Sequence, residues 1–135
     1  MAEALAGKWN VAESTNFDEY LKASGVGFMT RKVAGTVKPV LTITVNGNHI
    51  TINSASTFKN HTTEFDLGVP YKEETIDGRH FNTTFTWEDG KLVQKQEAID
   101  KGDKPSVITR YIKDGKLYID MVCEGVSATR VYTKA

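Results

Sequence analysis

The chain has 135 residues, enough for one domain with a substantial core, and its 17 lysine and arginine residues balance its 17 aspartate and glutamate residues. A zero formal charge argues against general binding to nucleic-acid backbones, which needs a basic excess. No apolar run approaches the roughly 20 residues of a membrane span, the first residues lack a secretory signal, and the single cysteine cannot form an internal disulfide. These features favour one domain, residues 1–135, in the cytoplasm.

Helical patterns are confined to the front of the chain. The segment "NFDEYLKASG" predicts a short helix that begins after Asn16 as the N-cap and stops at Gly25. The segment "VGFMTRKVAG" predicts a second short helix, and Pro39 prevents its simple continuation. We therefore expect a helical pair over about residues 16–36.

From residue 40 onward, apolar residues alternate with polar ones and the alternation is interrupted by turn signals. Asn-Gly and Asp-Gly are favoured in tight hairpins because both central residues need a positive φ. No long helical crossover separates the strands, so the pattern predicts an all-β meander of antiparallel strands. The turn signals are Asn46-Gly47, Asp77-Gly78, Asp89-Gly90, Asp114-Gly115 and Glu124-Gly125.

Several polar side chains share strand faces with apolar ones. Arg110 lies between Ile108 and Ile112, and Arg79 is on the face of Phe81. A filled core rejects such residues, because an unpaired buried charge costs several kcal/mol. A sheet closed around a hydrated cavity tolerates them, since water or a ligand can satisfy the donors. The same faces also carry Thr83, Gln94, Gln96, Ser54 and Ser56.

The last strand, "ATRVYTK", places Arg130 and Tyr132 on one face. That face alone is undecided, because Val131 and its neighbours could equally point inward. Arg79, next to a turn, could also be a strand-end arginine that extends outward to water. Arg110 is in the middle of its strand and favours the cavity. Two arginines and a tyrosine that converge in a cavity would bind a carboxylate, because the guanidinium fork matches its two oxygens.

The chain resembles, over essentially its whole length, the intracellular lipid-binding proteins of the fatty-acid-binding type, and among them the heart, adipocyte and myelin type. The resemblance rests on "GKWNVAESTNFDEYL", "GVGFMTRKVAGTVKP", "STFKN", "FDLGVPYKEET" and "GVSATRVYTK". It implies a ten-stranded antiparallel up-and-down clamshell barrel with a helix-turn-helix lid. It also implies a monomeric carrier of one long-chain fatty acid that needs no cofactor and no metal.

The resemblance further implies which residues contact the ligand. Its carboxylate-binding positions fall on Arg110, Arg130 and Tyr132, with Arg110 often acting through water. Retinol carriers of the family have glutamines at the arginine positions, so an acid is favoured over an alcohol. Retinoic acid or another hydrophobic carboxylate is the alternative ligand. The expected cavity and portal residues are Phe17, Leu21, Pro39, Phe58, Ile76, Asp77, Arg79 and Gln96.

Two departures from the family pattern bear on the expected shape. Ile76 is larger than the alanine common in close relatives, which changes the expected width of the portal. The segment "EAIDKGDKPSV" predicts a longer hairpin loop, away from the carboxylate. Because a closed barrel has no permanent doorway, we expect Phe58 and the helix that carries Phe17 and Leu21 to be the mobile part.

A β-barrel enzyme is the main alternative of a different class. The three histidines, His49, His61 and His80, lack metal-ligand spacing, and no nucleophile motif is present. Cys123 shares an apolar face with Met121 and is expected to be a packed, inert thiol. We therefore expect a binding protein and no enzyme.

Lys22, Arg31 and Lys32 match positions that form a nuclear-import patch in adipocyte-type relatives. The simplest interpretation is three solvated cations on a helical lid. The same cations could also meet anionic membranes during ligand transfer. The sequence leaves open nuclear entry, transient membrane contact and plain solvation.

Overall fold

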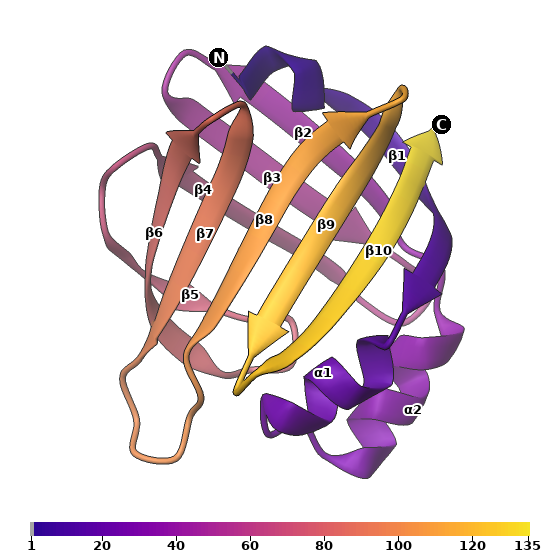
Figure 1. Cartoon of the computed structure of the whole chain (residues 1–135), viewed down its shortest axis with the longest axis vertical. Coiled ribbons are helices and arrows are strands. Elements are labelled where there is room, and N and C mark those ends of the chain that lie inside the picture. The colour runs from indigo at the N-terminus through magenta and orange to yellow at the C-terminus, as the bar shows by residue number, and fades with distance from the viewer. Residues whose placement is uncertain (1) are drawn as a thin grey trace.

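The computed structural model describes residues 2–135 as one antiparallel sheet of ten strands (Figure 1). The strand order is β4-β3-β2-β1-β10-β9-β8-β7-β6-β5, so consecutive strands pair throughout except at β4 and β5, and the first and last strands pair with each other. This is the expected antiparallel barrel. The strands are β1 (Gly7–Thr15), β2 (Val40–Asn46), β3 (His49–Ala55), β4 (Asn60–Asp66), β5 (Tyr71–Glu74), β6 (His80–Glu88), β7 (Lys91–Ala98), β8 (Ser106–Lys113), β9 (Lys116–Cys123) and β10 (Val126–Lys134).

Helices close the two ends of the barrel. The helices α1 (Phe17–Ala23) and α2 (Phe28–Thr36) connect β1 to β2 and cover one end, and the short 3-10 helix η1 (Ala2–Leu5) lies at the other (Figure 1). Leu5 is buried, and its carbonyl accepts a hydrogen bond of 2.9 Å from the indole Nε1 of Trp9. The end opposite the lid is therefore filled with apolar side chains.

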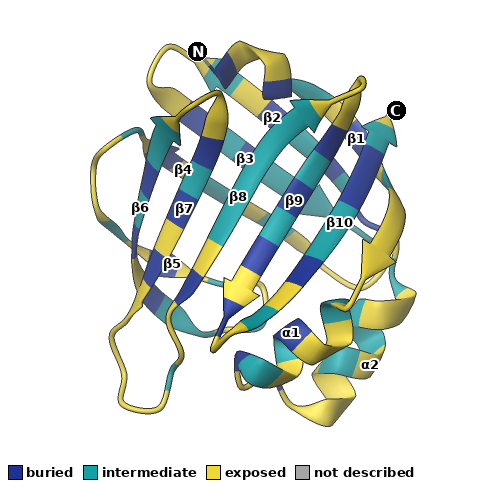
Figure 2. Cartoon of the chain, viewed as in Figure 1, coloured by how far each residue is buried: buried dark blue, intermediate teal, exposed yellow. Residues whose placement is uncertain are grey.

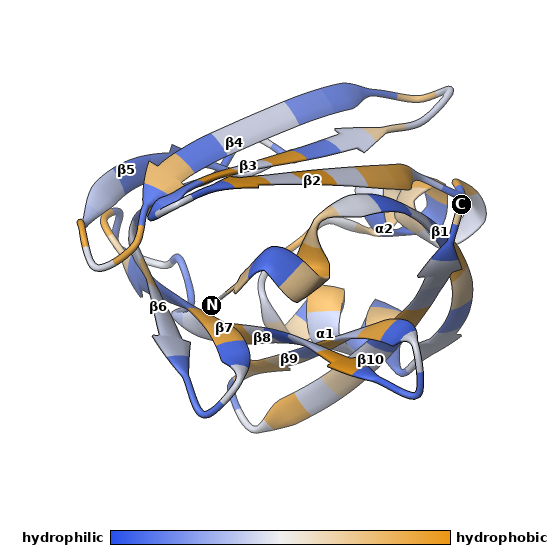
Figure 3. Cartoon of the chain, turned by 90° about the horizontal axis from the view of Figure 1, so that it is seen from above, coloured by the Kyte–Doolittle hydropathy of each residue, from blue (hydrophilic) through white to orange (hydrophobic). Residues whose placement is uncertain are grey.

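Two layers of strands face each other across the interior. Seen from above, β2, β3 and β4 lie in one layer and β7 to β10 in the other (Figure 3). The ring of Phe65 on β4 stacks on that of Phe85 on β6, with 3.5 Å between the centroids, and so links these two strands. Thr63 and Tyr71 share a hydrogen bond of 2.9 Å and connect β4 to β5, where backbone pairing is missing among the described residues. Side chains thus close the barrel where the backbone ladder does not.

All five predicted turns form, but in only three of them do both residues of the predicted pair have a positive φ. Asp89, Asp114 and Glu124 have φ values of 51 to 52° and each precedes a glycine with positive φ, as two-residue hairpins require. At the first hairpin, Asn46 still pairs with His49, so only the glycine adopts a positive φ. The turn after Asp77 likewise uses only its glycine. The loop at 99–105 is longer than the two-residue turns on either side, as expected.

The start of the lid corrects one prediction. Helix α1 does begin after Asn16, but the Asn16 side chain does not cap it. Asn16 adopts a left-handed conformation (φ 61°, ψ 20°), and its Nδ2 donates a 2.9 Å hydrogen bond to the carbonyl of Ser127. Because asparagine tolerates this conformation, its amide ties the lid to β10 in place of capping the helix.

The two lid helices are fixed to different degrees. Tyr20 of α1 is buried, and its hydroxyl lies 2.5 Å from Ser106 Oγ, which itself donates to the carbonyl of Val122. Arg79 donates a hydrogen bond of 3.0 Å to the carbonyl of Ser24 at the end of α1. Helix α2 has no buried residue (Figure 2). Within residues 2–135, neither lid helix has the length and apolar composition needed to cross a membrane.

One irregularity interrupts the ladder between β1 and β10. Val11 pairs with Tyr132, but the next pair is Glu13 with Val131, so Ala12 is an extra residue. Such a β-bulge reverses which face the following side chains occupy. As a result Ser14, and not Glu13, lies on the face of its partner Arg130.

Candidate functional site: two arginines in adjoining pockets

The sheet places the predicted carboxylate-binding residues on β8 and β10, with β9 between them. Ile119 of β9 is the register partner of Arg110 on β8 and of Arg130 on β10. With strands about 4.8 Å apart, the Cα atoms of the two arginines are separated by about 10 Å. Tyr132 lies two residues after Arg130 and therefore on the same face.

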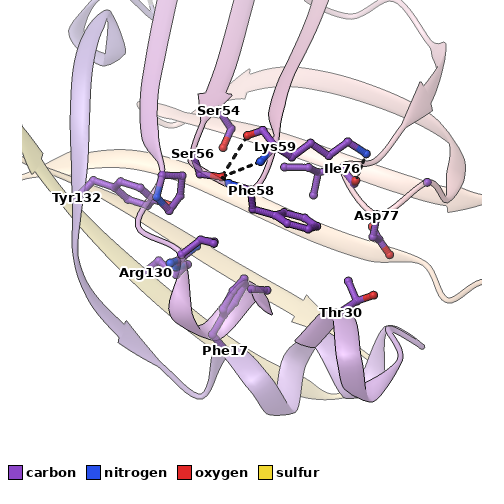
Figure 4. A pocket seen from close by; sticks show the side chains of 14 residues that line it. Phe17, Thr30, Ser54, Ser56, Phe58, Lys59, Ile76, Asp77, Arg130 and Tyr132 are labelled. Atoms are coloured by element: carbon purple, nitrogen blue, oxygen red, sulfur yellow. Dashed lines mark hydrogen bonds between the residues drawn. The ribbon is translucent and has the colours of Figure 1, made fainter. Parts of the chain in front are cut away.

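The larger of two adjoining cavities, here called the outer pocket, has a volume of about 370 Å³ and lies under the lid (Figure 4). Phe17 from α1 and Phe58 from the turn between β3 and β4 both reach into it. Phe58 is 57% exposed, whereas Tyr132 at the far side is buried. The predicted residues that line this pocket are Phe17, Pro39, Phe58, Ile76, Asp77, Arg130 and Tyr132.

Arg130 is held on one side of its guanidinium. Its Nε donates a hydrogen bond of 2.9 Å to Ser14 Oγ. The guanidinium carbon lies 4.3 Å from the centroid of the Phe17 ring and 5.7 Å from that of Tyr132. Stacking of this kind orients a guanidinium while its edge donors stay available. Arg130 is therefore oriented but keeps donors for a ligand at the pocket.

Tyr132 supplies a neutral hydroxyl. Burial raises its pKa above the ordinary value, and the charges of Arg130 and Arg110 oppose that rise. The hydroxyl consequently keeps its proton at neutral pH and can donate it to an anion.

The smaller cavity, here called the inner pocket, has a volume of about 240 Å³. It shares Ser54, Ile76 and Asp77 with the outer pocket, so the two adjoin. Its walls combine apolar side chains with an unusual number of polar ones. The predicted residues that line it are Leu21, Ile76, Asp77, Arg79, Gln96 and Arg110, and Glu73 and Gln94 join them.

Arg110 has an incomplete set of partners. Its Nη1 donates a hydrogen bond of 2.8 Å to Gln94 Oε1. Its Nε is buried without any partner, the one such side-chain atom within residues 2–135. Burial lowers the pKa of Arg110, while the charge of Glu73 is the largest effect in the opposite direction. A buried donor without an acceptor is costly, so this atom favours an added acceptor from water or a ligand.

Glu73 is a functional candidate that the sequence reading missed. It is 7% exposed, and its Oε1 accepts hydrogen bonds from Thr83 (2.7 Å), Gln94 (2.9 Å) and Gln96 (3.1 Å). A signal was present, because alternation in "YKEET" places Glu73 on the inward face with Tyr71. Gln96, expected only as a cavity residue, is thus a partner of a buried carboxylate.

Arg79 and Asp77 form a clamp at the portal. Arg79 Nε and Asp77 Oδ2 are 2.6 Å apart. Burial would raise the pKa of Asp77, but the hydrogen bonds from Arg79 and Thr75 outweigh it, so the pKa is lowered. Through its further bond to Ser24, Arg79 connects the turn between β5 and β6 to α1. It does not extend to solvent as an isolated strand-end arginine.

The proposed cationic patch on the lid is only partly free. Arg31 is paired with Asp18 at 3.2 Å and donates a hydrogen bond of 2.7 Å to the carbonyl of Val26. Its side chain is 15% exposed. Lys22 and Lys32 are therefore the members of the patch with the least restricted side chains.

Comparison with known proteins identifies the family. Residues 6–135 match the model of the lipocalin / cytosolic fatty-acid binding protein family. The chain belongs to this family. The family and the relatives are described as binding proteins, which agrees with the expectation from the sequence. Three similar proteins illustrate the relationship.

Fatty acid-binding protein homolog 5 of Caenorhabditis elegans is 47% identical over 98% of this chain and 98% of its own. The crystal structure of apo C. elegans lipid binding protein 8 superimposes with a TM-score of 0.96 at 34% identity, covering 100% of this chain and 98% of the other. A Schistosoma mansoni fatty acid binding protein in complex with arachidonic acid gives a TM-score of 0.89 at 32% identity, covering 98% and 96%. These likenesses confirm the fold class.

Proposed function

We propose that this protein is a cytoplasmic, monomeric carrier that binds one long-chain fatty acid within a single domain of residues 1–135. Arg110, Arg130 and Tyr132 hold the carboxylate, and the tail extends past Phe17 and Phe58. The observation that carries the proposal is the buried, unpartnered Nε of Arg110, in a row with a second inward-facing arginine. Two guanidiniums and a protonated phenol form a donor set suited to a carboxylate.

The related proteins support a fatty acid as the ligand class. The nematode relative bears a fatty-acid-binding name, and the schistosome protein was solved with arachidonic acid. The sequence motifs favour the heart, adipocyte and myelin subgroup. Retinoic acid or another hydrophobic carboxylate is the alternative, because it would satisfy the same donors.

The tail supplies most of the affinity in this proposal. Burial of about fourteen methylenes at ~0.8 kcal/mol each contributes roughly 11 kcal/mol before costs. Ordering of the tail and loss of translational freedom reduce that figure. The head group therefore mainly fixes orientation and selects an acid over an alcohol.

Titration calorimetry of the delipidated protein with oleate tests the proposal. We expect saturable binding near one equivalent, and oleyl alcohol should bind more weakly. The absence of saturable oleate binding would contradict the carrier function. Tighter binding of retinoic acid than of oleate would favour the alternative ligand.

Transient membrane contact is a second proposal, based on exposed residues of α2. Phe28 and Met29 are 65% and 72% exposed on its first turn, near Lys32. Apolar side chains beside a cation suit an anionic bilayer surface. A Phe28→Ser, Met29→Ser variant should transfer fatty acid to anionic vesicles more slowly with unchanged affinity. We also propose that the cytoplasmic carrier can enter the nucleus.

A further inference from the structure

Glu73 is a buried carboxylate that the proposed fatty-acid site does not use. It lies on β5, and neutral groups donate all its hydrogen bonds: the hydroxyl of Thr83 and the amides of Gln94 and Gln96. Among the ion pairs within residues 2–135, none includes it. Because a buried anion is costly without compensation, its countercharge must act from beyond contact distance.

Gln94 connects that anion to Arg110. Its Nε2 donates to both oxygens of Glu73, at 2.9 and 3.1 Å, and its Oε1 accepts from Arg110 Nη1 at 2.8 Å. The two partners fix the amide orientation, since a carboxylate needs the amino group and a guanidinium needs the oxygen. One side chain therefore links a buried anion and a buried cation across β5, β7 and β8.

The charges around the two pockets do not cancel completely. Asp77 and Arg79 neutralise each other in their ion pair. Glu73 offsets Arg110 through Gln94. Arg130, which lines the outer pocket, has no acidic hydrogen-bond partner among the described residues. Lys59 also lines the outer pocket, but it is exposed and its ammonium donates a hydrogen bond of 2.7 Å to the carbonyl of Ile76. Apart from this exposed cation, the charged side chains at the two pockets leave a single excess positive charge.

We propose that Glu73 is a specificity-determining residue, which as the countercharge of Arg110 restricts the cavity to amphiphiles with a singly charged head group. This inference rests on the proposed function, because it concerns the head group held by Arg110 and Arg130. A singly charged head makes the buried set neutral. A doubly charged head, such as an alkyl phosphate, leaves a net negative charge beside Glu73, where weak solvation strengthens the repulsion.

Two ligands with the same tail and the same tetrahedral head separate charge from shape. Hexadecyl sulfate carries one negative charge, and hexadecyl phosphate at pH 8 carries nearly two, since its second pKa is about 6. We expect the natural protein to prefer the sulfate. In Glu73→Gln, the affinity ratio of phosphate to sulfate should rise about tenfold, the order of one charge–charge interaction across roughly 12 Å at an effective dielectric constant near 20.

Glu74→Gln is the matched control. Glu74 is the next residue of β5, its side chain is 65% exposed, and its substitution changes the net charge equally. Its affinity ratio should stay within about twofold of the natural protein, because an exposed charge is screened by water and salt. A similar rise in both variants would overturn the inference, since net charge alone would then explain it.

The remaining outcomes are equally clear. An unchanged ratio in Glu73→Gln, or an equal loss for both ligands, assigns Glu73 to the scaffold and overturns the inference. If Glu73→Gln does not fold, the same ratio is compared between Arg110→Gln and Arg110→Gln/Glu73→Gln, which lacks both buried charges. A palmitate titration of the natural protein separates the two proposals. Saturable palmitate binding with an unchanged phosphate-to-sulfate ratio in Glu73→Gln contradicts only the role of Glu73. No palmitate binding contradicts both the carrier function and the role of Glu73.

Discussion

The two arginines of the site are the same residue type in one row of the sheet, but their surroundings differ. Arg110 is surrounded by protein, has a buried unpartnered Nε, and is linked to the anion Glu73. Arg130 lies under the lid, stacks on Phe17 and bonds to Ser14. The charge of Arg110, the inner cation, is compensated by Glu73 of the protein itself. Arg130, the outer cation, is oriented only by neutral groups. The outer arginine is therefore the one that depends on a ligand for its countercharge.

The largest expected effect comes from Arg130→Gln. The substitution keeps a donor but removes the charge, so fatty-acid binding should weaken by roughly 1–3 kcal/mol. Binding of the matching fatty alcohol should change much less, and the stability of the empty protein should hold or rise because a partly desolvated charge is gone. Calorimetry with palmitate and hexadecanol measures both ligands.

Arg130→Lys is the control for that substitution. It keeps the charge but loses the flat guanidinium that stacks on Phe17, so its loss of affinity should be intermediate. Equal weakening of acid and alcohol in Arg130→Gln would mean that Arg130 does not bind the carboxylate.

The two lid helices also differ in how firmly they are held against the barrel, because α1 has a buried tyrosine and α2 has no buried residue. Tyr20→Phe removes the hydrogen bond between α1 and Ser106, which should lower the free energy of unfolding by about 0.5–1.5 kcal/mol. Amide exchange should be slower in α1 than in α2 in the natural protein, and this gap should narrow in the variant. This order of exchange rates is the reverse of the sequence-based expectation, which assigned the motion to the helix with Phe17 and Leu21. Faster exchange in α1 than in α2 would contradict the predicted order and would support that expectation.

Acid should weaken the ion pair between Asp77 and Arg79, because the carboxylate is protonated while the guanidinium keeps its charge. The pKa of Asp77 is lowered in the folded protein, so its contribution to stability is present above the unfolded pKa and is lost as pH falls through the folded value. Asp77→Asn should therefore be less stable at pH 7, by about 1 kcal/mol at most, with the difference shrinking toward low pH. Denaturant unfolding at pH 7 and at pH 3 measures this. A constant difference would contradict the assignment.

The smallest effect distinguishes the two arginines by their solvent exposure. Salt screens exposed charges more than buried ones. In Arg110→Gln, where only the outer cation remains, a rise from 0.05 to 0.5 M salt should weaken palmitate binding about two- to threefold more than in Arg130→Gln. An equal salt dependence would indicate that both cations are similarly hydrated.

The antiparallel strands could be predicted from local patterns, whereas their closure into a ten-stranded barrel was implied by the family resemblance. Alternation and the Asp-Gly turns define the strands, and Arg110 stands out because it lies in the middle of an apolar face. The assignment of Arg110, Arg130 and Tyr132 to a carboxylate remains a prediction, although the structure places all three on adjoining pockets.

Other parts of the site depend on contacts between distant segments. Tyr20 and Ser106 are 86 positions apart, and no local pattern connects them. Glu73 was visible as an inward acid, but its role needs Gln94 and Arg110 from two other strands. Asn16 looked like a cap because its sequence context fits one, yet a tertiary hydrogen bond to Ser127 determines its conformation.

The bulge at Ala12 has a chemical consequence. In a regular ladder the alternation of β1 would place Glu13, not Ser14, on the face of Arg130. A carboxylate from the protein would then occupy the outer cation and compete with every ligand. The extra residue puts a hydroxyl there instead. The extra residue Ala12 thus leaves Arg130 without a carboxylate partner from β1 and available to an anionic ligand.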